Sequence, residues 1–299
     1  MLGNDISELI GNTPILRING FGVYNLYAKL EYMNPFSSAK DRAAYYMIKG
    51  ALERGEIDRD TVIIEPTSGN TGVALSAIGS AMGFKVVIAM PESMSEERRK
   101  LIRGFGAELV LTDKSLGMKG ATEKAEELKR EYGNAWIPNQ FDNPDNPRAH
   151  YETTGPEILR DMPDLDFFVA TIGTGGTISG CARYLKENCS KVKVYGVEPE
   201  ESPLLSKGFA GPHGIQGIGA NFIPGNVDRS LIDEVVTVDL ATSISTMQKA
   251  MGNSGVFGGI SSGASLSAAL KIARENPGKK VLCILTDTGE RYLSSALWK

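Results

Sequence analysis

The stretch that decides the fold reads Asp166-Phe167-Phe168-Val169-Ala170-Thr171-Ile172-Gly173-Thr174-Gly175-Gly176-Thr177. Its apolar first half predicts a buried strand over 166–172, and its glycines and threonines predict a turn that leads into a helix from Ile178. Free N–H groups at the start of such a helix can hold a phosphate, and glycines permit the close approach. An ordinary glycine-rich turn is the alternative. A strand, a turn and a helix in this order are typical of an α/β protein with a parallel sheet.

The same order of strand, turn and helix recurs along the chain. Apolar, β-branched runs predict strands at 25–30, 61–65, 85–90, 107–112, 166–172, 191–197, 234–238 and 280–285. Helical patterns fill most of the gaps; one is expected to begin after Ser95, an N-cap followed by two glutamates, and to stop near Gly104 and Gly106. The densest cluster of turn-forming residues spans 139–150, so we place a boundary between two α/β halves near Asn146.

Composition sets bounds on the class of protein. The chain has 299 residues, of which 41% are hydrophobic and 23% charged, with a net charge of −4. These values suit a globular enzyme of about two domains, and the absence of a basic block argues against nucleic acid or an anionic membrane as partner. No apolar run reaches about 18 residues, and Met1 is not followed by a charged and then apolar leader. We therefore expect a cytoplasmic protein without a membrane partner.

Cysteine and histidine are scarce. The three cysteines, Cys181, Cys189 and Cys283, form no CxxC pair, so neither a disulfide framework nor a zinc ribbon is predicted. The two histidines, His150 and His213, lie far apart in the sequence and leave few candidates for a metal site. We therefore predict no metal, and we expect His150 to support a helix start rather than to transfer protons.

One lysine stands out by its setting, in the stretch Pro35-Phe36-Ser37-Ser38-Ala39-Lys40-Asp41-Arg42. A lysine among small residues after an extended segment can form a Schiff base with a carbonyl cofactor. Most lysines are solvated surface charges, which is the plain alternative for Lys40. The chain also contains two loops that suit a ligand, the first of which is the glycine-rich turn at 173–177. Together with Lys40 they favour the cofactor interpretation.

The second of these loops is Thr67-Ser68-Gly69-Asn70-Thr71, which precedes a helix expected to run through Val73 to Ala81. Its hydroxyls, amide and free N–H donors suit a carboxylate, although a simple helix N-cap is the alternative. A phosphate site, a carboxylate site and a candidate Schiff-base lysine together describe an amino acid bound to pyridoxal phosphate. A dinucleotide site with Glu198 as the ribose-binding acid is weakened because Ile178 stands where the third glycine belongs.

Five motifs and the opening Ile10-Gly11-Asn12-Thr13-Pro14 resemble the cysteine synthase (O-acetylserine sulfhydrylase) family of fold-type II pyridoxal-phosphate enzymes. The motifs are Asn34 to Arg42, Glu65 to Gly72, Gly173 to Thr177, Gly259 to Gly263 and Asp287 to Tyr292. The resemblance implies an α/β protein of the tryptophan synthase β type, with two open parallel-sheet, three-layer αβα domains. It further implies a smaller, mobile N-terminal domain at 41–146 and a larger domain at 1–40 plus 147–299 that anchors the cofactor.

The resemblance also implies roles for individual residues. Lys40 would hold pyridoxal 5'-phosphate as an internal aldimine and later serve as the catalytic base. The other cofactor-binding residues would be Asn70 at the ring hydroxyl, Ser261 at the pyridine nitrogen, and Gly173, Thr174, Gly175, Gly176 and Thr177 at the phosphate. The substrate-binding residues would be Thr67, Ser68, Gly69, Thr71, Gln140, Gly217 and Asn221.

The reaction that the resemblance implies makes L-cysteine from O-acetyl-L-serine and sulfide through an α-aminoacrylate intermediate. A homodimer is expected, with serine acetyltransferase as a further candidate partner. Phe36, Ala39 and Asn221 depart from the family's usual residues, so a cysteine desulfhydrase, a cystathionine β-synthase-like enzyme and a serine or threonine dehydratase stay open. The absence of an arginine near Gln216 argues against a phosphorylated donor, and the presence of Lys40 argues against a non-catalytic amino-acid-binding relative.

Overall fold

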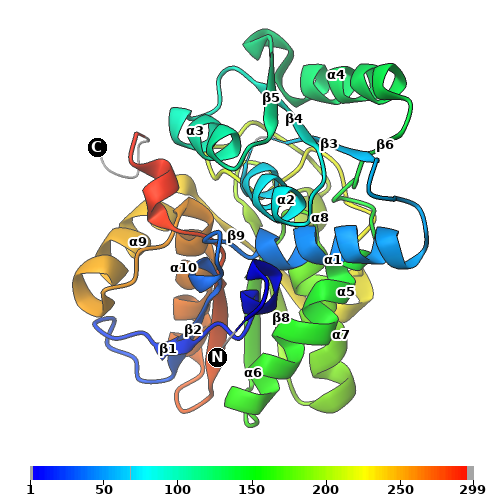
Figure 1. Ribbon diagram of the computed structural model, residues 1–299. Helices are drawn as coiled ribbons and strands as arrows, with labels where there is room; N and C mark the ends of the chain where they lie inside the picture. Colours follow the sequence, from blue (N-terminus) through cyan, green and yellow to red (C-terminus); the bar gives the residue numbers. More distant parts are fainter. Residues whose placement is uncertain (1–2, 68, 295–299) are drawn as a thin grey trace.

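The computed structural model describes residues 3–67 and 69–294 and contains two sheets (Figure 1). The six-stranded sheet has the order β1-β2-β10-β7-β8-β9, and the four-stranded sheet has the order β5-β4-β3-β6. All neighbouring strands pair in parallel except β1, which runs antiparallel to β2 at the edge of the larger sheet. The strands are β1 (Ile15–Arg17), β2 (Leu26–Leu30), β3 (Val62–Pro66), β4 (Val86–Pro91), β5 (Glu108–Thr112), β6 (Ala135–Trp136), β7 (Phe167–Thr171), β8 (Lys193–Pro199), β9 (Glu234–Val238) and β10 (Val281–Leu285).

Helices connect the parallel strands. The α-helices are α1 (Lys40–Glu53), α2 (Asn70–Ala81), α3 (Glu96–Gly104), α4 (Gly117–Tyr132), α5 (Asp145–Ala149), α6 (Gly155–Asp161), α7 (Gly176–Asn188), α8 (Leu204–Lys207), α9 (Leu240–Ser254) and α10 (Ile260–Glu275). Short 3₁₀ turns lie at Ile6–Leu9, Glu31–Met33, Lys114–Leu116, Arg229–Leu231 and Gly289–Tyr292, and a π-helical turn at His150–Thr154 joins α5 to α6. None of the described helices is long and apolar enough to cross a membrane.

The larger sheet is the middle of a three-layer sandwich, because alternate side chains of its strands face two separate cores. On β10, Val281, Cys283 and Leu285 pack in a core with α9 and α10, whereas Leu282 and Ile284 pack in a core with α6 and α7. This alternation is the period of two that a strand imposes on its side chains. Helices therefore cover both faces, as expected for a parallel sheet.

The smaller sheet is layered in the same way (Figure 1). Ile63 of β3 and Ile88 of β4 pack with α1, α2 and α3 on one face, and Ile64 and Val87 pack with α4 on the other. In each sheet, the C-terminal ends of the parallel strands and the N-termini of the helices that follow them thus lie along the same edge. Ligands of open α/β sheets bind at this edge.

The predicted α/β class with two parallel sheets is confirmed, and all eight predicted strands lie within two residues of an observed one. The prediction missed β1 and β6, which are three and two residues long and too short to show a period. The helix expected from Ile178 begins at Gly176, so the end of the glycine-rich motif is already helical. The turn-rich stretch around Asn146 is also helical, since α5 tolerates Pro147 in its first turn.

Candidate active site

Lys40 lies at the N-terminus of α1, next to the residues that follow β10. The N–H of Ala39 donates to the carbonyl oxygen of Thr286 at 2.9 Å, and Ser38 pairs with Asp287 in an isolated β-bridge. The N–H of Lys40 donates to Oγ of Ser38 at 3.3 Å. These bonds fasten the start of α1 to the C-terminal edge of the larger sheet.

The environment of Lys40 favours a neutral amine. Burial lowers the pKa of Lys40, and the charges of Asp287 and Asp41 oppose this effect only in part. A neutral lysine is nucleophilic and basic, whereas the ammonium form is neither. Lys40 can therefore attack a carbonyl group and accept a proton.

The residues from Gly173 to Thr177 form a loop after β7, on the same sheet edge. The loop leads into α7, whose first N–H groups have no acceptor within the helix. Close packing leaves no room for a side chain at two of these positions: a Cβ on Gly173 would lie 2.4 Å from the carbonyl oxygen of Gly217, and one on Gly176 would lie 1.9 Å from Oδ1 of Asn146. Gly175 has a φ of +86°, which favours glycine. This bare helix N-terminus fits a phosphate group.

Asn146 and His150 contact the hydroxyl groups of Thr174 and Thr177. The sequence did not identify either residue as part of the site. Nδ2 of Asn146 donates to Oγ1 of Thr174 at 2.9 Å, and Nε2 of His150 lies 3.1 Å from Oγ1 of Thr177. Both come from the stretch of turn-forming residues after 139, whose helical form brings them against α7. His150 begins the π-helical turn and contacts Thr177 in the first turn of α7, so its contacts agree with the prediction that it supports a helix start.

The buried imidazole of His150 makes stability pH-dependent. Burial lowers its pKa to about 3, so the folded state binds no proton at pH 5, whereas the unfolded chain binds one below about 6.5. Stability is therefore lost as the pH falls. We expect the free energy of unfolding to fall by about 2 kcal/mol more in the wild type than in His150→Gln between pH 6.5 and 5. Urea unfolding at both pH values measures this, and equal losses would contradict it.

The packing around Gly176 predicts a sensitive position. In Gly176→Ala the new methyl group must displace Asn146, which also holds Thr174. We expect the dissociation constant of the phosphate-bearing cofactor to rise about tenfold or more through loss of this contact. Gly252→Ala is a matched control, because a Cβ there has nothing within 4 Å. Equilibrium dialysis measures the affinity, and equal values for both variants would contradict the prediction.

The loop after β3 lies at the corresponding edge of the smaller sheet. The N–H of Gly69 donates to Oγ1 of Thr67 at 3.3 Å, and Oγ1 of Thr71 donates to Oε1 of Gln140 at 2.6 Å. Gln140 follows β6, so the neighbouring strands β3 and β6 bring it to Thr71. The predicted residue Ser68 lies outside the described residues.

Asn70 connects the two sheet edges. Its Nδ2 donates to Oδ2 of Asp287 at 2.8 Å, and its Oδ1 accepts a hydrogen bond from Arg291. Tyr292 also donates to Oδ2 of Asp287, at 2.6 Å, while Oδ1 of Asp287 is buried without a hydrogen-bond partner among the described residues. The loop that carries Asn70 therefore meets the residues beside Lys40, and an orphaned carboxylate oxygen lies between them.

The remaining predicted residues lie around this edge. Ser261 is buried at the start of α10, where the adjacent Ser262 accepts a hydrogen bond from the N–H of Thr286 at 2.9 Å. Gly217 lies against Gly173 in an exposed turn. Asn221 is exposed on the same loop, and no hydrogen bond within residues 3–67 and 69–294 joins it to the other groups.

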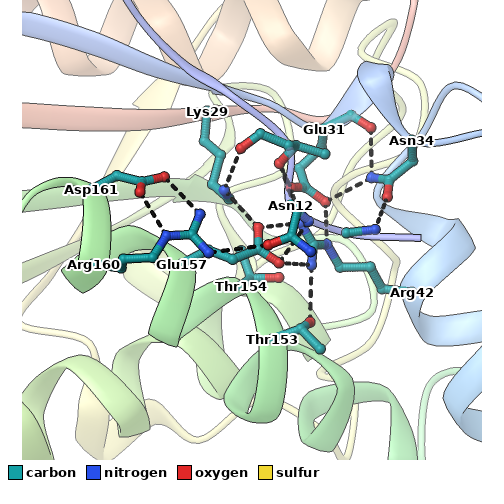
Figure 2. Close-up of polar contacts among 12 residues, drawn as sticks. Asn12, Lys29, Glu31, Asn34, Arg42, Thr153, Thr154, Glu157, Arg160 and Asp161 are labelled. Atoms are coloured by element: carbon teal, nitrogen blue, oxygen red, sulfur yellow. Dashed lines mark hydrogen bonds and ion pairs between the residues drawn. The ribbon is translucent and has the colours of Figure 1, made fainter. Parts of the chain in front are cut away.

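A buried ion network anchors α1 through Arg42 (Figure 2). Arg42 contacts Glu31 at 2.7 Å and Glu157 at 2.6 Å, and Lys29 contacts Glu157 at 2.7 Å. Burial disfavours the charge of Glu31, but the charge and hydrogen bonds of Arg42 outweigh it and lower the pKa of Glu31 to about 2. The two cations and two anions balance, so the network can remain fully charged inside the protein. It fixes α1 two residues after Lys40.

The structure gives Glu198 a structural role. Its two carboxylate oxygens accept hydrogen bonds from the N–H groups of Leu205 and Ser206, at 2.9 and 3.0 Å. The carboxylate therefore caps α8 and is not presented to a ribose. This arrangement argues against the dinucleotide alternative.

Comparison with known proteins agrees with the site. The pyridoxal-phosphate dependent enzyme family matches residues 6–287. Cysteine synthase B of Campylobacter jejuni is 53% identical over 294 residues, which cover 98% of each chain. A solved hydrogen sulfide-producing enzyme from Fusobacterium nucleatum is 47% identical with a TM-score of 0.93, covering 98% of this chain and 100% of that chain. A solved cysteine synthase from Entamoeba histolytica is 40% identical with a TM-score of 0.96, and the match covers 100% of this chain and 91% of that chain. The chain therefore belongs to the pyridoxal-phosphate dependent enzymes, in the cysteine synthase family of fold type II.

Proposed function

We propose that this protein makes L-cysteine from O-acetyl-L-serine and sulfide, with acetate as the other product. The observation that carries the proposal is the position of Lys40, a partly buried amine with a lowered pKa, at the sheet edge that also presents the glycine-rich start of α7. Within the cysteine synthase family, this pair of features suits pyridoxal 5'-phosphate, whose aldehyde and phosphate need a nucleophilic amine and a bare helix N-terminus.

Each cofactor-binding residue has a task that follows from its chemistry. Lys40 would hold the cofactor aldehyde covalently, and residues 173–177 would bind the phosphate. Asn70 would bond to the ring hydroxyl, and Ser261 to the ring nitrogen. The bound cofactor withdraws electrons from the substrate's α-carbon, which makes the α-proton acidic and lets a β-substituent leave. Because the hydroxyl of Ser261 is neutral, it tempers this withdrawal and favours exchange at the β-carbon over transamination.

Lys40 would also move the proton. The amine of Lys40 would take the α-proton of the bound substrate. It would return a proton to the α-carbon once sulfide has added at the β-carbon. The lowered pKa supports both steps, since the amine must accept a proton near neutral pH.

The substrate carboxylate would bind at the N-terminus of α2 and at Gln140. The residues proposed for this side are Thr67, Ser68, Gly69, Thr71, Gln140, Gly217 and Asn221. The free N–H groups of a helix N-terminus suit a carboxylate, and the hydrogen bond between Thr71 and Gln140 supports a shared site.

Closure of the smaller domain would exclude water from the reaction. We propose that residues 41–146 form this mobile domain and that residues 1–40 and 147–299 form the anchoring domain. Arg98 of α3 donates to Oε1 of Gln216 at 3.0 Å, which supports contact between the two across the substrate side. Exclusion of water protects a reactive intermediate from hydrolysis.

Release of sulfide from L-cysteine is the second candidate function. Asn221 is polar where the family usually has glycine, and the solved relative from Fusobacterium nucleatum is named for hydrogen sulfide production. An exposed amide on the loop that carries Gly217 could orient water in place of sulfide. Other β-replacements and dehydration remain variants of the same chemistry.

The proposed assembly and location rest on the family alone. We propose a cytoplasmic homodimer that acts on small molecules, with serine acetyltransferase as a candidate partner. Sedimentation of the purified protein, alone and with that enzyme, measures both associations.

Competing substrates test the function. We expect the kcat/KM for O-acetyl-L-serine with sulfide to exceed that for sulfide release from L-cysteine by about a hundredfold, a ratio that binding differences can supply. Asn221→Gly is the matched variant, and an increase in this ratio would assign Asn221 to sulfide release. A larger kcat/KM for L-cysteine in the wild type would overturn the synthase proposal in favour of the second candidate.

A further inference from the structure

A buried glutamate behind Gln140 has no role in the proposed function. Glu65 lies near the C-terminal end of β3 and is 2% exposed. Its Oε1 accepts a hydrogen bond from Nε2 of Gln140 at 3.0 Å, while Oε2 is buried without a partner among the described residues. Burial of a carboxyl group costs free energy unless its oxygens are hydrogen-bonded or paired with a charge.

The side chain of Gln140 is oriented by its two neighbours. Its Oε1 accepts a hydrogen bond from Thr71 at 2.6 Å, so the amide nitrogen must face Glu65. An amide group has two N–H donors. One donates to Glu65, and the other is available to a ligand.

The main chain of Gln140 is also held. Its carbonyl oxygen accepts hydrogen bonds from Nδ2 of Asn146 at 2.8 Å and Nδ2 of Asn226 at 2.9 Å. With the backbone fixed, only the side-chain torsions of Gln140 remain, and the contacts with Glu65 and Thr71 determine them.

We propose that Glu65 is the positioning residue of the substrate-carboxylate subsite: it accepts one N–H of Gln140 and thereby directs the other N–H at the carboxylate of the amino acid. The inference rests on the proposed function, in which Gln140 binds that carboxylate. Without Glu65 the amide of Gln140 can rotate and present its oxygen to the carboxylate, which would repel it.

The protonation state of Glu65 is compatible with this role. Burial raises the pKa of Glu65 to about 8, and hydrogen bonds from Asn139 and Gln140 oppose the rise only in part. At neutral pH most of the group is therefore the neutral acid, and a proton on the unpartnered Oε2 leaves Oε1 as a carbonyl acceptor. A glutamine at position 65 can supply the same carbonyl acceptor.

Binding of L-alanine and L-alaninamide to the holoenzyme tests the proposal. Neither compound has a β-substituent that can leave, and only L-alanine has a carboxylate. Their dissociation constants are measured from the change in cofactor absorption. We expect Glu65→Leu to weaken L-alanine about tenfold and L-alaninamide by less than about twofold, since one charge-assisted hydrogen bond is lost. Glu65→Gln should retain the affinity for L-alanine.

Two further variants separate positioning from general damage. Glu198→Leu removes another buried acid near a strand end, 3% exposed on β8, and should leave the ratio of the two dissociation constants unchanged. In a Gln140→Leu background, Glu65→Leu should have no further effect on the ratio. If Glu65→Leu does not fold, Glu65→Asp is the substitute, because it moves the acceptor away from Gln140 by the length of one methylene. Glu65→Asp should likewise weaken L-alanine more than L-alaninamide.

The outcomes distinguish this inference from the proposed function. Equal weakening of L-alanine and L-alaninamide, or no weakening of either, would overturn the role of Glu65. Failure of the wild type to form cysteine would instead overturn the proposed function, and the ratio for L-alanine over L-alaninamide would still decide what Glu65 does.

Discussion

Lys40→Ala is expected to lower kcat for cysteine formation by at least about a thousandfold, because one amine is proposed to bind the cofactor, remove the α-proton and return it. All three tasks are lost together when the amine is removed. The structure supports this expectation: burial lowers the pKa of Lys40, whereas the nearby Asp41 and Asp287 are acids. Steady-state kinetics with O-acetyl-L-serine and sulfide measure the change.

A second lysine on the same helix provides the control. Lys49 is 39% exposed and pairs with Glu53 on the surface of α1. Lys49→Ala should therefore retain kcat within about twofold, as expected for a weak surface ion pair. Borohydride should fix the cofactor to the wild type and to Lys49→Ala but not to Lys40→Ala. A Lys40→Ala enzyme with full activity would overturn the assignment of the site.

Arg42→Met is expected to destabilise the fold by about 3–5 kcal/mol, because it leaves the carboxylates of Glu31 and Glu157 buried without their main counter-charge. Arg42 is 1% exposed and contacts both carboxylates within 2.8 Å (Figure 2). Urea unfolding of the wild type and the variant measures the loss. Catalysis should suffer as well, because the network fixes the helix that begins at Lys40.

A variant with balanced charges distinguishes the loss of the counter-charge of Arg42 from the loss of its packing. The double variant Arg42→Met/Glu31→Gln restores a neutral network and should recover part of the lost stability. Lys100→Met is the surface control, since Lys100 and Glu96 are more than 70% exposed and such pairs contribute at most about 1 kcal/mol. Equal effects of Arg42→Met and Lys100→Met on unfolding would contradict the account of the network.

The parts of the site that could be predicted are those written in consecutive residues. The run from Asp166 to Thr177 contains a strand, a bare turn and a helix start, and the structure shows each of them. In the second motif, Asn70 and Thr71 form the start of α2, as the small polar residues there indicated. Lys40 was recognisable from its small neighbours and from its company with these loops, since the C-terminal ends of parallel strands meet at one edge.

The parts that escaped prediction depend on long-range packing. The contact of Arg42 with Glu157 joins residues 115 positions apart, and no local pattern marks either of them as a partner. Asn146 and His150 lie in a stretch of turn-forming residues that is helical in the structure, which brings them against Thr174 and Thr177. Glu65 belonged to a recognised motif, but its contact with Gln140 required the pairing of β3 with β6.

The most direct test of the central claim is a stepwise reaction of the purified holoenzyme, followed by its visible absorption and by product analysis. We predict that O-acetyl-L-serine alone shifts the cofactor absorption and releases stoichiometric acetate. Sulfide should then restore the original spectrum as an equal amount of L-cysteine appears. A spectrum that O-acetyl-L-serine leaves unchanged, with L-cysteine alone producing the shift and free sulfide, would contradict the synthase assignment.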